Sequence, residues 1–175
     1  AVTARLARGE AADLVLLPTR LLDAQAQAGR VLADGITPVL RSGIGMCVRE
    51  GQDVPDITSL AALTRTLLQA RVIALSAAGS GDYVSKRLLQ RLGIEAEVGP
   101  RCRVSDSEPA GRVVARGDAD LGFQQICELL PIHGITFAGA LPDEVQQHTD
   151  VAAGLLADGN QVQASHQWLA YLQSP

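Results

Sequence analysis

Short apolar runs alternate with amphipathic, helix-like stretches through the middle of the chain, and this alternation constrains the fold more than any other feature. The runs at residues 71–75 (RVIAL) and 119–124 (ADLGFQ) have the length and apolar content of buried strands. Helical patterns flank and separate them, at residues 58–70, 83–92 and 109–116. Strands that alternate with helices predict an α/β fold with parallel sheets.

The outer parts of the chain fit the same scheme. Residues 12–18 (ADLVLLP) predict a buried parallel strand, and residues 37–49 predict a long strand with a Ser-Gly interruption. Further strands are predicted at 95–98, 135–138 and 149–155, and further helices at 2–9, 20–28 and 165–172. Because the chain opens on a helix and not on a strand, the first sheet lacks a neighbouring strand, and we expect the natural polypeptide to extend N-terminally.

Composition narrows the class of protein. Of the 175 residues, 47% are apolar and 19% are charged, which allows a sizeable core and excludes a disordered chain. The formal net charge of −4 and the aromatic content of 3% argue against nucleic acid as a partner, because phosphate binding needs a basic surface. No apolar stretch approaches about 18 residues, so membrane insertion is not expected. No signal peptide is visible.

The residue types that usually carry chemistry form no recognised constellation. The cysteines Cys47, Cys102 and Cys127 have no CxxC spacing, and the histidines form no HxxxH pair. We therefore predict no disulfide framework, no metal and no cofactor. No serine lies in a GxSxG elbow, so no catalytic residue is predicted.

One turn has the composition of an anion-binding loop. Residues 76–82 (SAAGSGD) are small and lie between a predicted strand and a predicted helix. The free N–H groups and the dipole of a helix start favour an anion, although Ser80 or Asp82 could equally be a plain N-cap. A bulky residue at Gly81 is expected to abolish binding and leave the fold intact.

A second polar turn, residues 105–109 (SDSEP), also enters a helix. Its carboxylates, Asp106 and Glu108, would repel an anion if they pointed toward it. Helix capping by Ser105 or Ser107 is therefore the simpler interpretation.

Five segments, in order, resemble type II periplasmic solute-binding proteins, in particular the molybdate-binding branch. They are ARLARGEAADLVLLP, VLRSGIGMCVREG, SLAALTRTLLQARVIAL with GSGDYVSKRLLQRLGI, VVARGDADLGFQQ and WLAYLQSP. The resemblance implies two α/β lobes, each a mixed or parallel sheet flanked by helices, joined by two crossover strands with the ligand held between them. We place the first lobe at residues 1–41 and 135–175 and the second at 42–134.

The resemblance also implies ligand-binding residues. The family's Pro-Ala-Gly turn maps onto Gly79, Ser80 and Gly81, with Gly79 in place of proline. A contact before the next helix maps onto Ser107, and a family tyrosine maps onto Gln125.

Two departures from the molybdate pattern bear on the ligand. Gln125 both donates and accepts hydrogen bonds, where a tyrosine would donate one to an oxyanion. The Arg41–Ser42–Gly43 segment at the lobe crossing adds a guanidinium suited to a planar carboxylate. The expected ligand is a small anion, an oxyanion or a small carboxylate, with Arg41 and Ser42 among the candidate binding residues. If Gln125 and Arg41 both face the cleft, a small organic anion is expected in preference to molybdate.

The family resemblance implies a periplasmic protein that delivers a small anionic ligand to the membrane subunits of an ABC importer. Two alternatives stay open. One is an isomerase of small polycarboxylates on the same fold, with Glu108 or Glu128 as the candidate base, so the sequence leaves open whether the chain is an enzyme. The other is a ligand-sensing effector domain of a transcription regulator.

Overall fold

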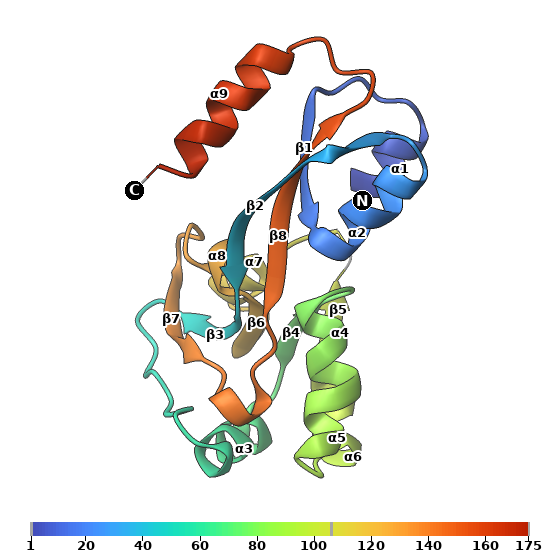
Figure 1. Ribbon diagram of the computed structural model, residues 1–175. Coiled ribbons are helices and arrows are strands. Elements are labelled where there is room, and N and C mark those ends of the chain that lie inside the picture. Colours follow the sequence, from blue (N-terminus) through green and yellow to red (C-terminus); the bar gives the residue numbers. More distant parts are fainter. Residues whose placement is uncertain (1, 106, 175) are drawn as a thin grey trace. The chain divides into compact units, whose positions relative to one another are not determined.

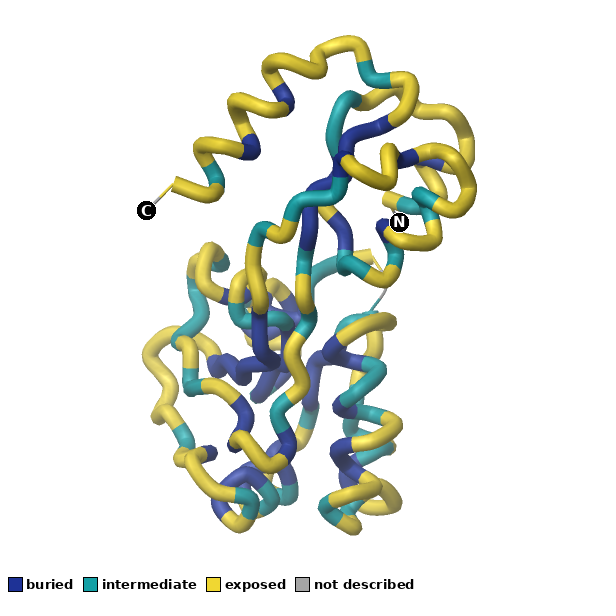
Figure 2. The backbone as a smooth tube through the Cα atoms, in the orientation of Figure 1, coloured by how far each residue is buried: buried dark blue, intermediate teal, exposed yellow. Residues whose placement is uncertain are grey.

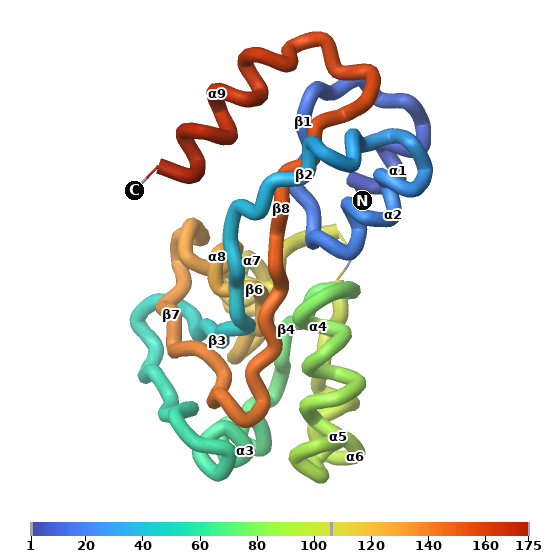
Figure 3. The backbone as a smooth tube through the Cα atoms, in the orientation of Figure 1, coloured from blue at the N-terminus to red at the C-terminus, as the bar shows by residue number. Residues whose placement is uncertain are grey.

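The computed structural model describes residues 2–105 and 107–174, which divide into two compact units. The first unit combines Ala1–Arg41 with Thr149–Pro175, and the second is Ser42–His148. The chain enters the second unit after strand β2 and leaves it before strand β8, as the colours of Figure 3 trace. Each unit has its own sheet and its own hydrophobic core.

The first unit is a three-stranded sheet, in the order β1-β8-β2, with three helices (Figure 1). Its strands are β1 (Leu14–Pro18), β2 (Val31–Ser42) and β8 (Thr149–Leu156); its helices are α1 (Val2–Ala7), α2 (Thr19–Gln27) and α9 (Val162–Leu172). Alternate residues of β1, Val15 and Leu17, are buried in a cluster with Leu22 of α2 and Val31 of β2.

The prediction of a parallel strand at residues 12–18 is wrong in direction. In the part of the chain that the structure describes, β1 pairs antiparallel with β8, from Leu14 opposite Leu155 to Pro18 opposite Val151. An apolar run shows that a strand is buried, and it does not show the direction of its neighbour.

The second unit is built on a five-stranded sheet in the order β5-β4-β6-β3-β7. Its strands are β3 (Ile44–Arg49), β4 (Ile73–Ser76), β5 (Cys102–Ser105), β6 (Leu121–Gln125) and β7 (Ile135–Ala140). Strand β4 lies between β5 and β6 and is parallel to both, whereas β3 is antiparallel to β6 and β7. The predicted α/β class with mixed and parallel pairing is confirmed.

The helices of the second unit cover this sheet. They are α3 (Leu60–Gln69), α4 (Ser80–Tyr83), the π-helical turn η1 (Val84–Leu88), α5 (Leu89–Arg91), α6 (Glu95–Val98), α7 (Ala110–Ala115) and α8 (Ile126–Leu129), with 3₁₀ turns η2 (Gly99–Arg101) and η3 (Asp143–Val145). Ser59 caps α3, because its side chain accepts the N–H of Ala62 at 3.2 Å. Buried residues are concentrated in β3, β4 and β6, as Figure 2 shows.

Several predicted elements differ from the structure. Residues 95–98, predicted as a strand, form helix α6, which follows Gly93 at φ +71° and buries Val98. The four letters EAEV alternate and fit either structure, so only packing decides. Strand β5 was not predicted, and the strand at 37–49 is in fact two strands, β2 and β3.

The segment that follows residue 134 was assigned to the first lobe from the sequence. In the structure β7 pairs with β3, from Arg49 opposite Ile135 to Gly45 opposite Ala140, and the second unit continues to His148. Strand β7 belongs to the second unit because it pairs with a strand far away in sequence, and local sequence patterns do not reveal such pairing.

Candidate functional site

Three polar turns meet at one edge of the second unit's sheet. Strands β4, β5 and β6 run in the same direction and end at Ser76, Ser105 and Gln125. Ser76 lies opposite Ser105 in the register, and Leu75 lies opposite Phe123. In open α/β sheets, ligands bind beyond the carboxyl ends of the strands. This edge, with the turns at 76–81 and 125–127 and the turn described at 105 and 107–109, is the candidate site.

The first turn is shaped by Ser76 and two glycines. Ser76 Oγ donates to Ala78 O at 2.9 Å, accepts the N–H of Gly81 at 3.3 Å and lies 3.3 Å from Ser80 Oγ. Gly79 turns the chain at φ +63° and ψ −115°, a conformation that favours glycine. Helix α4 then begins at Ser80, earlier than the predicted start at residue 83, and continues through η1 and α5.

Gly81 occupies the tightest place in this turn. A Cβ built there would lie 1.9 Å from Ser76 O and 2.6 Å from Ser76 N. Both atoms are backbone, so neither can move aside cheaply. This geometry argues against the expectation that a bulky residue at Gly81 leaves the fold intact.

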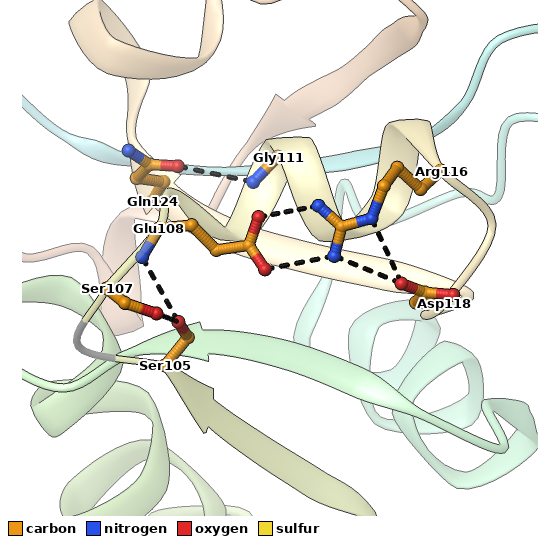
Figure 4. A network of polar contacts seen from close by, with 7 residues as sticks. All are labelled: Ser105, Ser107, Glu108, Gly111, Arg116, Asp118 and Gln124. Carbon is orange, nitrogen blue, oxygen red and sulfur yellow. Dashed lines mark hydrogen bonds and ion pairs between the residues drawn. The ribbon is translucent and has the colours of Figure 1, made fainter.

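The second turn is organised by Ser105. Its Oγ accepts the N–H of Glu108 at 3.2 Å and lies 3.5 Å from the Oγ of Ser107, which is exposed (Figure 4). Of the two predicted capping serines, Ser105 is the one that accepts a backbone N–H. Asp106, predicted as a second carboxylate in this turn, lies outside the described residues.

Glu108 is turned along helix α7 toward a guanidinium. Its two carboxylate oxygens lie 2.6 and 2.9 Å from the two terminal nitrogens of Arg116, whose Nε also donates to Asp118 at 3.1 Å (Figure 4). Hydrogen bonding to Arg116 lowers the pKa of the Glu108 carboxyl below its usual value. The charge that was expected to repel an anion is thus compensated by a bidentate partner.

Strand β6 ends in two glutamines on opposite faces of the sheet, and the second of them begins the third turn. Gln124 is buried, and its Oε1 accepts the N–H of Gly111 at 3.3 Å while its Nε2 donates to Glu128 Oε2 at 2.9 Å. Gln125 is half-buried, pairs with Ile44 of β3 and precedes helix α8. Gln124 therefore connects the first turn of α7 to α8.

The two residues before β3 support the backbone of the third turn. Gly43 O accepts the N–H of Ile126 at 2.9 Å, and the buried Ser42 Oγ accepts the N–H of Cys127 at 3.2 Å. Ser42, predicted as a ligand residue, thus supports the backbone of the third turn.

Six of the seven predicted site residues lie in the turns of this edge or in the Ser42 segment that borders it: Ser42, Gly79, Ser80, Gly81, Ser107 and Gln125. The seventh, Arg41, belongs to the first unit, where its Nε lies 3.5 Å from Asp150 Oδ1. Ser105 shapes its turn as a predicted cap, whereas the sequence did not identify Ser76 or Gln124 as shaping residues. Their position at strand ends was the available signal.

A pocket of about 430 Å³ lies where β4 and β6 begin and β3 ends. Arg49, Arg71 and Asp120 line it, and none of the predicted site residues does. Asp120 accepts the backbone N–H and a guanidinium N–H of Arg71, at 2.7 and 3.0 Å. Within residues 2–105 and 107–174, no three or more His, Cys, Asp or Glu side chains gather where they could hold a metal ion, and no helix is long and apolar enough to cross a membrane.

Two mixed α/β units connected by two chain crossings, with polar turns beyond parallel strands, define the class of type II periplasmic binding proteins. Solved structures agree. The periplasmic molybdate-binding protein of Azotobacter vinelandii matches with a TM-score of 0.76 at 16% identity, over 99% of this chain and 77% of that one. The substrate-binding domain described for a molybdenum ABC transporter of Clostridium difficile matches with a TM-score of 0.68 at 14% identity, over 99% and 75%. At these identities the likeness establishes the fold.

The sequence itself matches the bacterial extracellular solute-binding protein family over residues 1–175, and the chain belongs to that family. The predicted family resemblance and the predicted fold are confirmed. A protein of Pseudomonas sp. named aconitate isomerase is 37% identical over 174 residues, which cover 99% of this chain and 66% of that protein. The chain thus spans just under two thirds of that relative's length.

Proposed function

We propose that this protein is a periplasmic solute-binding protein that captures a small organic anion, with one or more carboxylates, for the membrane subunits of an ABC importer. The observation that carries the proposal is the edge where the turns after β4, β5 and β6 lie together. Its ligand residues are those of the sequence prediction: Arg41, Ser42, Gly79, Ser80, Gly81, Ser107 and Gln125.

The chemistry of the edge favours an anion. The helical segment from Ser80 to Arg91 starts at this edge, and its first-turn N–H groups and dipole attract negative charge. The hydroxyl of Ser107, in the turn that follows β5 at the same edge, is exposed. The carboxylate of Glu108, which would oppose an anion, is bound to Arg116.

Three features favour an organic carboxylate over molybdate. Gln125 offers an amide that can donate to one ligand oxygen and accept from a hydroxyl. The relative of 37% identity is named for aconitate, a tricarboxylate, and is far more similar in sequence than the molybdate-binding structures at 14–16%. Arg41 would supply the guanidinium that a carboxylate needs.

Thermal unfolding with a ligand panel tests the proposal. The panel contains cis-aconitate, trans-aconitate, citrate and tricarballylate on one side and molybdate and tungstate on the other. A ligand at 100 times its Kd stabilises the folded state by about 2.7 kcal/mol, which raises Tm by roughly 5–10 °C for a chain of this size. A shift with molybdate and none with any carboxylate would refute the ligand class.

A second candidate function is isomerisation of an unsaturated tricarboxylate, favoured by the 37% identity to aconitate isomerase. Moving the double bond of such a compound takes a proton from one carbon and returns a proton to another, so the reaction needs a base and no other reactant. Glu108 is poorly suited, because its bond to Arg116 lowers its pKa. Glu128 is exposed and accepts from Gln124, and it is the better candidate.

Proton NMR of cis-aconitate incubated with the protein distinguishes the two functions. Appearance of the trans isomer with the wild type and its loss in Glu128→Gln, with Glu108→Gln still active, is the result expected of an isomerase. Saturable binding of cis-aconitate, with no isomer formed over many hours, would support the transport function and exclude the isomerase.

A further inference from the structure

The side chain of Gln146 uses its whole amide to hold another part of the chain. Its Oε1 accepts the N–H of Ile44 at 2.7 Å and the N–H of Gln147 at 2.9 Å. Its Nε2 donates to Ile44 O at 3.0 Å and to Leu141 O at 3.2 Å. An amide has two donor hydrogens and two acceptor lone pairs, and all four are engaged.

The orientation of this amide is dictated by its partners. Ile44 offers one N–H and one C=O to the same side chain, so the oxygen of Gln146 must meet the first and its nitrogen the second. A Cβ on Gly43 would lie 3.0 Å from the Cδ and Nε2 of Gln146, so the amide packs directly against that glycine. Gln146 pairs with Ile44 much as a neighbouring strand would.

Ile44 lies beside the third turn of the candidate site. It pairs with Gln125 across β3 and β6. The two residues before it supply the acceptors for α8, namely Gly43 O for Ile126 and Ser42 Oγ for Cys127. Whatever fixes Ile44 therefore also fixes the backbone that presents Gln125.

We propose that Gln146 is a positioning residue for the third turn of the ligand site, which presents Gln125, and that it acts through Ile44 and Ser42–Gly43. The inference rests on the proposed function for its ligand, and on hydrogen bonds within the second unit for its mechanism. It requires an amide at residue 146, because the position must accept from Ile44 N and donate to Ile44 O at once. No motif in the sequence marks this residue.

The substitution Gln146→Glu tests the requirement. A carboxylate retains the two acceptor contacts and loses both donors, so when ionised it faces the carbonyl oxygens of Ile44 and Leu141. This environment raises the pKa of the introduced carboxyl. The native contacts are therefore best preserved at low pH, where the carboxyl is protonated, and are lost as pH rises through the raised pKa.

Hydrogen exchange of the amides of Ile126 and Cys127 is the ligand-free readout, always compared with the wild type at the same pH. At pH 8 the Gln146→Glu protein should exchange them about tenfold faster or more, and at pH 5 most of the excess should disappear. The ionisable residues Asp143, Glu144 and His148 are present in both proteins, so the comparison at one pH isolates the effect of residue 146. Gln147→Glu, an exposed position next in sequence, is the matched control and should match the wild type.

Affinity for cis-aconitate, measured by calorimetry, is the second readout and should fall at pH 8 and recover at pH 5. Unchanged exchange at pH 8, or an equal change at both pH values, would overturn the positioning role. If the two amides exchange as expected but no carboxylate binds to the wild type, the proposed ligand is refuted and the positioning role of Gln146 is retained. If Gln146→Glu does not fold at pH 8, Gly43→Ala, which pushes on the same amide, should accelerate the same two amides; no acceleration there overturns the proposal.

Discussion

Replacing Gly81 by alanine should cost stability and ligand binding together. The new Cβ would lie 1.9 Å from Ser76 O and 2.6 Å from Ser76 N, far inside van der Waals contact. Relieving it requires a backbone shift of more than about 1 Å, which also breaks the 3.3 Å bond from Gly81 N to Ser76 Oγ. Overpacking of this kind typically costs about 1–3 kcal/mol, and the lost hydrogen bond adds about 0.5–1.5 kcal/mol.

Together these effects lower the free energy of unfolding by roughly 2–4 kcal/mol, which lowers Tm by roughly 4–16 °C. Circular dichroism on heating measures the shift. Gly99→Ala is the matched control: no atom lies within 4 Å of its Cβ position and the backbone is helical, so Tm should stay the same or rise slightly. A Gly81→Ala protein that melts within about 2 °C of the wild type would show that the packing of this turn has been misjudged.

Three further predictions follow from the described contacts. Burial raises the pKa of the Cys47 thiol to about 12, whereas Cys127 is exposed, so a thiol reagent at pH 8 should label Cys127 quickly and Cys47 only after denaturation; rapid labelling of Cys47 in the folded protein would contradict this. The pKa of Glu108 is lowered by Arg116, so its contribution to stability is present above pH 4.5 and lost as pH falls through the lowered pKa. Arg116→Met should therefore be less stable than the wild type at pH 7 and equal to it near pH 2, by urea denaturation; a difference that persists at pH 2 would mean that packing, and not charge, is what Arg116 contributes. Ser76→Ala should lower Tm by roughly 1–6 °C, because its hydroxyl organises the first turn, and a Ser85→Ala control, which removes a bond to Gly81 O within the helical segment, should keep ligand affinity.

The elements that sequence alone predicts are those with a strong local signal. The apolar run at residues 71–75 and the helix capped by Ser59 were predicted because periodicity and capping are properties of neighbouring residues. Strand β5 was not predicted because it has only four residues, CRVS, too few to show a clear alternation of apolar and polar side chains, and two of them are exposed. The helix at 95–98 is equally short, and its four residues fit the pattern of a strand as well as that of a helix.

Non-local pairing accounts for most of what the sequence did not show. The residues of β8 that pair with β1 are 133 to 141 positions away in sequence, and β7 joins the second unit through β3. The contacts of Gln146 with Ile44 likewise bridge 102 positions. Turn chemistry identified residues 76–82 and 105–109 as candidates, but it did not distinguish residues that contact a ligand from residues that shape the turn.

That distinction follows from comparing Ser76 with Ser105. Both end parallel strands, they are register partners, and each accepts a backbone N–H from its own turn, that of Gly81 or of Glu108. Their hydroxyls are thereby committed to the protein, in the way that a capping side chain satisfies a helix start. The groups left to meet an anion at these two turns are then backbone N–H groups of the first helical turn and the exposed hydroxyl of Ser107. Rigid, preformed donors of this kind respond mainly to the shape and charge of a ligand. Under the proposed function, specificity for a carboxylate over an inorganic oxyanion would then rest on side chains of this edge such as Gln125, whose amide can donate to one oxygen and accept from a hydroxyl.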